Sequence, residues 1–172
     1  MIGALRFLLL TMLAAAVLAA PGNSAPKASP TPPASQAALM RPLTLSKLAD
    51  MDFGYLGVTT AGTAVINPIT NTMTVTGGVI RLGGTPHAAR FAGATRSSAV
   101  VNIKIPNGTI LLTRVGGTQT IQLNAFTLDG QSKRTMAQAG VFEFSVGATL
   151  RPIANQVDGV YTGTFDVTIQ YP

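Results

Sequence analysis

Residues 159–171 read GVYTGTFDVTIQY and carry the clearest secondary-structure pattern in this chain of 172 residues. Bulky apolar side chains alternate there with threonine, aspartate and glutamine. Because successive side chains of a strand point to opposite faces, the pattern predicts a half-buried β-strand close to the C-terminus. Gly163 falls on the apolar face, where we expect it to make room for a bulky neighbour or to mark a bend. The other positions of this face are Tyr161, Phe165, Val167, Ile169 and Tyr171.

The sequence from residue 41 onward is typical of short antiparallel strands. Runs rich in Val, Ile, Thr and Phe are separated by Gly, Asn, Asp and Pro, and no segment has a helical period. We expect about eight to ten strands in an all-β, immunoglobulin-like antiparallel β-sandwich, a single domain of residues 41–172. A closed barrel is the alternative. Besides the last strand, the candidates are residues 43–48, 53–58, 64–69, 72–76, 79–82, 101–105, 110–114, 121–128 and 142–146.

Two local features refine this expectation. Residues 101–105 and 110–114 flank the turn-forming residues Pro106, Asn107 and Gly108, which favours a β-hairpin. The apolar residues after Ala125 are out of phase with those before it, which predicts a β-bulge near this position. Most of the runs are shorter than the roughly ten residues of an outer-membrane barrel strand, so we disfavour that architecture.

The N-terminus reads as a targeting segment. Residues 7–20 are apolar without a charge, but they are shorter than the roughly 18 to 20 residues of a membrane span and Pro21 follows directly. We expect a signal peptide of residues 1–19, cleaved after Ala19, and hence no stable transmembrane anchor. The chain has no cysteine for a lipoprotein anchor. The predicted location is therefore exported: periplasmic, cell-surface or extracellular.

Residues 20–40 are rich in Pro, Ala and Ser, a composition that buries too little apolar surface to offset its ordering entropy. We expect a flexible linker or arm. Without cysteine, the domain that follows cannot use disulfides and must rely on a packed core, for which 47% hydrophobic residues supply material. The formal net charge is +6, but the cations are scattered rather than clustered, so we expect no nucleic-acid partner.

The residue inventory offers little for catalysis. His87 is the single histidine, and no serine lies in a G-x-S-x-G elbow, so we expect no enzyme, no catalytic residue and no cofactor. Asp50 and Asp52 face the same side of an extended segment and could hold a metal ion weakly, but no further acid completes a recognised loop. We favour turn-capping or solvated carboxylates. Asn107 also begins a glycosylation triplet, for which the turn is the preferred interpretation.

Three segments resemble an exported bacterial family, the domain-of-unknown-function 4402 family. They are residues 42–54 (PLTLSKLADMDFG), 146–155 (VGATLRPIAN) and 159–171. The last segment also resembles the C-terminal strand of chaperone-usher pilus subunits, including spore-coat-U-like ones, because those end in an alternating apolar strand with a penultimate aromatic residue and a preceding glycine. Tyr171 and Gly159 occupy these two places.

The pilin resemblance implies an assembly mechanism. In pilins the last strand lies beside a groove left by a missing immunoglobulin strand, and a partner's N-terminal arm fills that groove by β-strand addition. It implies as partners copies of the chain itself or related subunits, and a periplasmic chaperone. Many such pilins have a disulfide, which this chain cannot form because it has no cysteine. Pro30, Pro32 and Pro33 interrupt its arm, which leaves residues 37–45 as the donor candidate. The implied assembly strand comprises Gly159, Tyr161, Gly163, Phe165, Val167, Ile169 and Tyr171.

Two functions remain open from the sequence. The first is a non-enzymatic structural or adhesive β-sandwich, assembled by strand exchange as in a fimbria. The second is a self-complete binding module that recognises a glycan or an envelope protein through its loops, for example residues 82–95.

Overall fold

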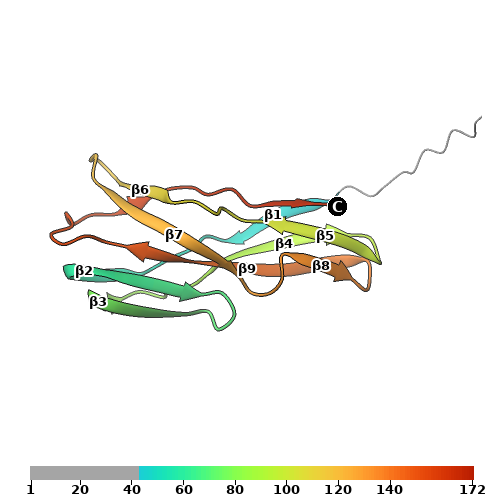
Figure 1. Cartoon of the computed structure of the whole chain (residues 1–172), viewed down its shortest axis with the longest axis horizontal. Coiled ribbons are helices and arrows are strands. Elements are labelled where there is room, and N and C mark those ends of the chain that lie inside the picture. The colour runs from blue at the N-terminus through green and yellow to red at the C-terminus, as the bar shows by residue number, and fades with distance from the viewer. Residues whose placement is uncertain (1–42) are drawn as a thin grey trace, which may run out of the picture. The chain divides into compact units, whose positions relative to one another are not determined.

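The computed structural model describes residues 43–172, which form eleven strands and no helix (Figure 1). The predicted signal peptide (1–19) and arm (20–40) lie outside the described residues. The strands are β1 (Thr44–Ala49), β2 (Tyr55–Asn67), β3 (Thr72–Gly83), β4 (Ala89–Thr95), β5 (Ala99–Lys104), β6 (Ile110–Arg114), β7 (Thr120–Leu128), β8 (Lys133–Met136), β9 (Gly140–Arg151), β10 (Tyr161–Thr162) and β11 (Thr168–Gln170).

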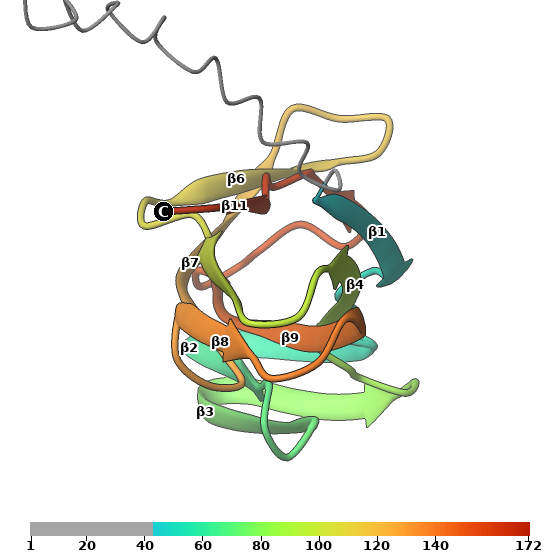
Figure 2. The ribbon, with the colours of Figure 1, turned by 90° about the vertical axis from the view of Figure 1, so that its right-hand side faces the viewer.

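The strands form two antiparallel sheets in a sandwich-like arrangement, which confirms the predicted all-β class (Figures 1 and 2). The larger sheet has the order β1-β4-β9-β7-β6-β10, and the smaller one has the order β11-β5-β8. β9 is the central strand of the larger sheet. Its first half pairs with β4 and its second half with β2, while β7 runs along its other edge. The β2–β3 hairpin therefore extends the large sheet beyond β4.

The strand order matches most of an immunoglobulin sandwich. One immunoglobulin sheet has the order A-B-E-D and the other has C-F-G. In chain order, β1, β4, β9 and β7 occupy the positions A, B, E and D, and β5 and β11 occupy C and F. The β2–β3 hairpin, β6 and β8 are additions to this plan. Within residues 43–172 no strand occupies the G position beside β11.

The core consists of two apolar clusters. The first surrounds Ile66 and Ala148, between the β2–β3 hairpin and β7, and the second surrounds Phe144 and Val146. Met51 and Phe126 pack against both clusters and join them. In the second cluster the Phe144 ring stacks on that of Phe91 at 5.4 Å between centroids, an arrangement that adds to the stabilisation from buried area.

The hairpin β2–β3 corrects the prediction of four short strands between residues 53 and 82. β2 has 13 residues and β3 has 12, so each is longer than any of the four strands predicted in this region. Gly77 and Gly78 lie at a bulge inside the hairpin, where the pairing register shifts between Val58 and Gly62. A Cβ on Gly77, whose φ is +67°, would lie 2.6 Å from the carbonyl oxygen of Ala61. The glycine permits close backbone approach without ending the strand.

The hairpin predicted from residues 101–105 and 110–114 is wrong. β5 pairs with β8 and β11 in the small sheet, whereas β6 pairs with β7 and β10 in the large one. Both edges of β5 are already occupied, and Pro106 lacks the N–H that would continue a ladder. Residues 105–109 therefore carry the chain from one sheet to the other.

The predicted bulge in β7 is confirmed. The register between β7 and β9 shifts between Asn124 and Thr127, and Ala125 has a φ of +49°, a left-handed conformation that is uncommon for alanine. The bulge lets Leu123 face the first core cluster and Leu128 the second.

Candidate assembly edge of the sandwich

The C-terminal segment passes from one sheet to the other. β10 pairs with β6, β11 pairs with β5, and residues 163–167 between them belong to no strand pair in the described chain. The alternation predicted from the sequence is present: Phe165, Val167 and Ile169 pack against the second core cluster, and the intervening polar side chains are exposed. The predicted strand is thus a half-buried extended segment that is paired only at its two ends.

Phe165 anchors the unpaired part of this segment. Its ring lies 6.4 Å from that of Phe91 in an edge-to-face arrangement at 74°, and 5.2 Å from that of Phe126. Such pairs contribute about 0.5–1.5 kcal/mol each beyond buried area. Side-chain packing therefore holds residues 163–167 in place without a ladder.

Gly159 and Gly163, the two glycines of the predicted assembly strand, have different environments. A Cβ on Gly163 would lie 2.7 Å from Cδ2 of Leu112, so the glycine makes room for this bulky neighbour, as expected. Gly159 lies outside the strand, in the turn that precedes β10, with a φ of +150°. A Cβ there would lie 2.5 Å from Nε of Arg114, which donates a hydrogen bond to the carbonyl oxygen of Asp158 at 2.7 Å.

Two tyrosines fix the ends of the segment. Tyr161 packs against the first core cluster, its hydroxyl donates to the carbonyl oxygen of Val157 at 2.6 Å, and it accepts from Nε2 of Gln156 at 2.7 Å. The hydroxyl of Tyr171 lies 3.0 Å from Oγ1 of Thr95, at the end of β4. This contact links the small sheet to the large one.

One edge of β11 faces β5 and the other faces β1. The N–H of Ile103 in β5 donates to the carbonyl oxygen of Ser132, on the β8 side, and Ile103 lies opposite Ile169. Because hydrogen-bonded and non-bonded pairs alternate in an antiparallel ladder, the backbone N–H and C=O of Ile169 point away from β5. Thr168 and Gln170 point theirs toward it.

β1 lies on the side of β11 that faces away from β5 (Figure 2). Strand β1 pairs with β4 along one edge, and β1 and β11 run in opposite directions. No strand pairing joins β1 to β11 in the described chain. We call the region between them the β1–β11 gap. It is the place that strand G occupies in a complete immunoglobulin sheet.

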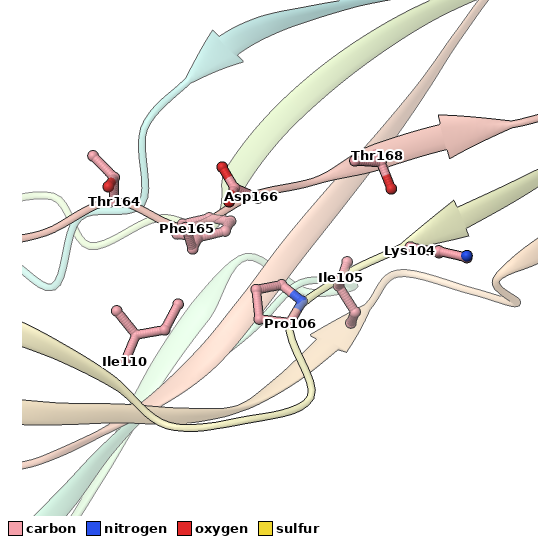
Figure 3. A pocket seen from close by; sticks show the side chains of 8 residues that line it. All are labelled: Lys104, Ile105, Pro106, Ile110, Thr164, Phe165, Asp166 and Thr168. Carbon is pink, nitrogen blue, oxygen red and sulfur yellow. The ribbon is translucent and has the colours of Figure 1, made fainter.

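Grooves lie on both sides of Phe165. One of about 110 Å³ lies between the end of β1 and the unpaired residues 163–165, and is lined also by Lys47, Asp50, Met51, Ala89 and Phe91. The other, of about 340 Å³, lies between the β5–β6 connection and the C-terminal segment (Figure 3). In Figure 3 Phe165 lies above Ile110 and Pro106, whereas Thr164 and Asp166 point away from them. Both grooves are lined by apolar and polar side chains.

The two carboxylates considered above as a weak metal site have separate partners. Asp50 Oδ1 accepts from Lys47 Nζ at 2.6 Å, and Asp52 Oδ1 accepts from the N–H of Gly54 at 2.7 Å. Among residues 43–172 no three His, Asp or Glu side chains gather into a metal-binding group. His87 forms a backbone bridge with Asp52, and its Nδ1 lies 2.7 Å from the carbonyl oxygen of Thr85. His87 and the serines at 97 and 98 lie at opposite ends of β4.

The loop expected at residues 82–95 is shorter than predicted. β3 extends to Gly83 and β4 begins at Ala89, so only residues 84–88 connect them. None of the described residues forms a helix that could cross a membrane.

These features define a class of protein: an antiparallel β-sandwich with an immunoglobulin-like strand order, in which none of the described strands occupies the G position or pairs across the β1–β11 gap. The chain belongs to the family described as Domain of unknown function (DUF4402), whose model matches residues 43–171. Neither the curated proteins nor the solved structures include a match to it.

Proposed function

We propose that this protein is an exported, non-enzymatic structural or adhesive subunit that completes its sandwich with a β-strand inserted into the β1–β11 gap. The observation that carries the proposal is the orientation of Ile169, whose backbone N–H and C=O point into the gap. An unpaired strand edge is a template for strand addition. The resemblance of the last segment to pilus subunits supports the same assignment.

The smaller groove beside Phe165 supports strand insertion as well. Met51 and Phe91 line the smaller groove together with Phe165, and all three also belong to the second core cluster or pack against it. An inserted strand with apolar residues on one face would extend this cluster. Each additional buried methylene contributes about 0.8 kcal/mol, so a few large side chains would stabilise the inserted strand substantially.

The inserted strand comes from another copy of the chain or from a related subunit. The donor candidate of residues 37–45 needs revision, because Thr44 opens β1 and Leu45 packs against its own second core cluster. We therefore assign the donor role to residues before 43. A periplasmic chaperone would protect the same edge before assembly.

The test compares residues 20–172 with a form that lacks residues 20–40. We expect ladders of multimers on gels of unboiled samples for the longer form, and monomers for the shorter one, because strand exchange needs the arm. Two monomeric forms, with a periplasmic chaperone supplied, would contradict the proposal.

A backbone substitution sharpens this test. Ile169→Pro removes the N–H that points into the gap and leaves the ladder to β5, which uses Thr168 and Gln170. We expect this variant to keep the sheet signal in circular dichroism and to lose the ladder of multimers. Ile169→Val keeps the N–H and is the matched control, with ladders like those of the parent chain.

The larger groove favours a second candidate function, a self-complete module that binds a glycan or an envelope protein. Phe165 and Pro106 supply an apolar platform, and Lys104 and Thr168 supply polar groups at its margin (Figure 3). A glycan array with the parent chain and with Phe165→Ala tests this function. Binding by a strictly monomeric chain, abolished in the variant, would favour it over strand exchange.

A further inference from the structure

The connection between β5 and β6 carries an Asn-Gly pair, which occurs only once in the chain, at Asn107 and Gly108. The sequence favours a hairpin turn for this pair, but the structure places it in the connection that leads from the small sheet to the large one. Asn107, Gly108 and Thr109 are all exposed. The pair is therefore not held by a ladder between the strands that flank it.

The local backbone of the pair is free of hydrogen bonds. Among residues 43–172, neither the Asn107 side chain nor the N–H of Gly108 has a hydrogen-bond partner. A Cβ on Gly108 would meet no atom within 4 Å, and the φ of this glycine lies outside the left-handed region. Exposed loops of this kind change conformation on the nanosecond-to-microsecond scale. The side-chain amide of Asn107 can therefore approach the backbone nitrogen of Gly108.

We propose that Asn107 is a site of spontaneous deamidation. The deprotonated backbone nitrogen of Gly108 attacks Cγ of Asn107 and forms the C–N bond of a cyclic succinimide, while the side-chain nitrogen takes up a proton and leaves as ammonia. Water then opens the ring at either carbonyl carbon, which gives aspartate or isoaspartate. The net reaction consumes water and releases ammonia, and it needs no enzyme or oxidant. This modification is independent of the assembly proposed above.

Asn71 and Asn124 are held by contrast. Oδ1 of Asn71 accepts a hydrogen bond from a backbone N–H at 2.8 Å, and Oδ1 of Asn124 accepts one from Nε of Arg151 at 2.9 Å. Each of them also precedes a residue with a side chain, which shields the nitrogen that would attack. Asp129 precedes a glycine, but both of its carboxylate oxygens accept hydrogen bonds. Asn107 should therefore react well before these residues.

The reaction places a carboxylate beside the larger groove. Pro106, which directly precedes Asn107, lines this groove together with Lys104 and Asp166 (Figure 3). A neutral amide is thus replaced by a negative charge next to the groove. Because residues 105–109 belong to no strand, the extra backbone methylene of isoaspartate interrupts no ladder. The fold should survive the modification while the charge beside the groove changes.

Peptide mapping tests the site in folded residues 20–172. Samples are stored at neutral or mildly alkaline pH and compared with one digested at once. Trypsin releases residues 105–114, in which Asn107 is the single asparagine. We expect this peptide to gain the mass difference between an amide and a carboxylate, faster at the alkaline pH because the attacking nitrogen must lose its proton. An isoaspartate methyltransferase should methylate it. Residues 115–133, which contain Asn124, are the internal control and should keep their mass.

Gly108→Ala is the matched variant, because its methyl group shields the attacking nitrogen and the φ of this position suits alanine. We expect conversion to slow by about tenfold, which corresponds to a barrier higher by about 1.4 kcal/mol. An unconverted Asn107, conversion of Asn124 at the same rate, or equal rates in the parent chain and Gly108→Ala would overturn the proposal. The converted chain should also keep the melting temperature of the fresh one, and a lost cooperative transition would contradict the tolerance of this connection.

Discussion

At the scale of single residues, one carboxylate connects three segments. Asp129 follows β7, its Oδ1 accepts from Nη2 of Arg134 in β8 at 2.5 Å, and its Oδ2 accepts from the N–H of Ser145 in β9 at 2.9 Å. The Arg134 guanidinium also lies 5.9 Å from the centre of the Phe144 ring. The pair is about one-fifth exposed and links the small sheet to the large one. Partly buried pairs with additional hydrogen bonds contribute more than exposed ones.

Removal of this carboxylate should lower the free energy of unfolding. We expect Asp129→Ala to cost about 2 kcal/mol, because Nη2 of Arg134 and the N–H of Ser145 both lose their acceptor. Lys47→Ala is the control: it breaks the exposed pair with Asp50 and should cost less than about 1 kcal/mol. Urea denaturation measures both differences. Equal midpoints for the two variants would show that Asp129 contributes no more to the free energy of unfolding than the exposed pair does.

Gly93 illustrates packing that a larger residue cannot match. A Cβ at this position would overlap the ring of Phe142 on the neighbouring strand, whereas a Cβ on Gly108 would meet no atom within 4 Å. We expect Gly93→Ala to lose about 1–3 kcal/mol through displacement of the ring. Gly108→Ala should change stability by less than about 0.5 kcal/mol. Thermal denaturation followed by circular dichroism compares them, and similar melting temperatures would contradict the assigned contact.

At the scale of elements, the β7 bulge sets which residues face the core. Deletion of Ala125 would remove the extra residue and leave Leu128 opposite Val146 in an unbroken register, so we expect cooperative unfolding to be retained. Ala125→Gly should be neutral or stabilise by up to about 1 kcal/mol, since its left-handed φ of +49° suits glycine. Ala92→Gly, in regular β4, should cost about 0.5–1 kcal/mol. Calorimetry tests the three variants, and a deletion variant without a cooperative transition would contradict this register.

Strands with period-two alternation could be predicted from the sequence, and strands of small or charged residues could not. The last segment, the bulge near Ala125 and the strand at residues 142–146 were all recognisable from parity. β4 (ARFAGAT) was missed because alanine and glycine have low strand propensity, and close packing against β9 selects them here. β8 (KRTM) was missed because it is a short polar strand of the small sheet.

Pairing partners were harder to predict than strands. Local turn residues suggested that residues 101–105 pair with residues 110–114, but long-range pairing with β8 and β11 takes both edges of β5. The alternating face of the candidate assembly segment could be predicted residue by residue. Its division into two short paired strands could not, because that depends on where β5 and β6 diverge.

At the scale of the whole molecule, the strands of residues 43–172 follow the order of an immunoglobulin domain, and none of them occupies the G position. Phe165, which packs against the second core cluster, lines the groove beside β1, and β11 directs the backbone of Ile169 toward the β1–β11 gap. Strand exchange would complete the small sheet. This proposal depends on the edge of β11 that faces away from β5, which pairs with no strand of residues 43–172.

Amide hydrogen exchange at single-residue resolution tests that edge most directly. In the form without residues 20–40, the N–H of Ile169 should exchange rapidly, and those of Thr168 and Gln170 should be protected by their ladder with β5. In assembled residues 20–172, Ile169 should become as protected as its neighbours. An Ile169 amide that is already protected in the monomer, or that still exchanges rapidly in the assembly, would contradict strand insertion between β1 and β11.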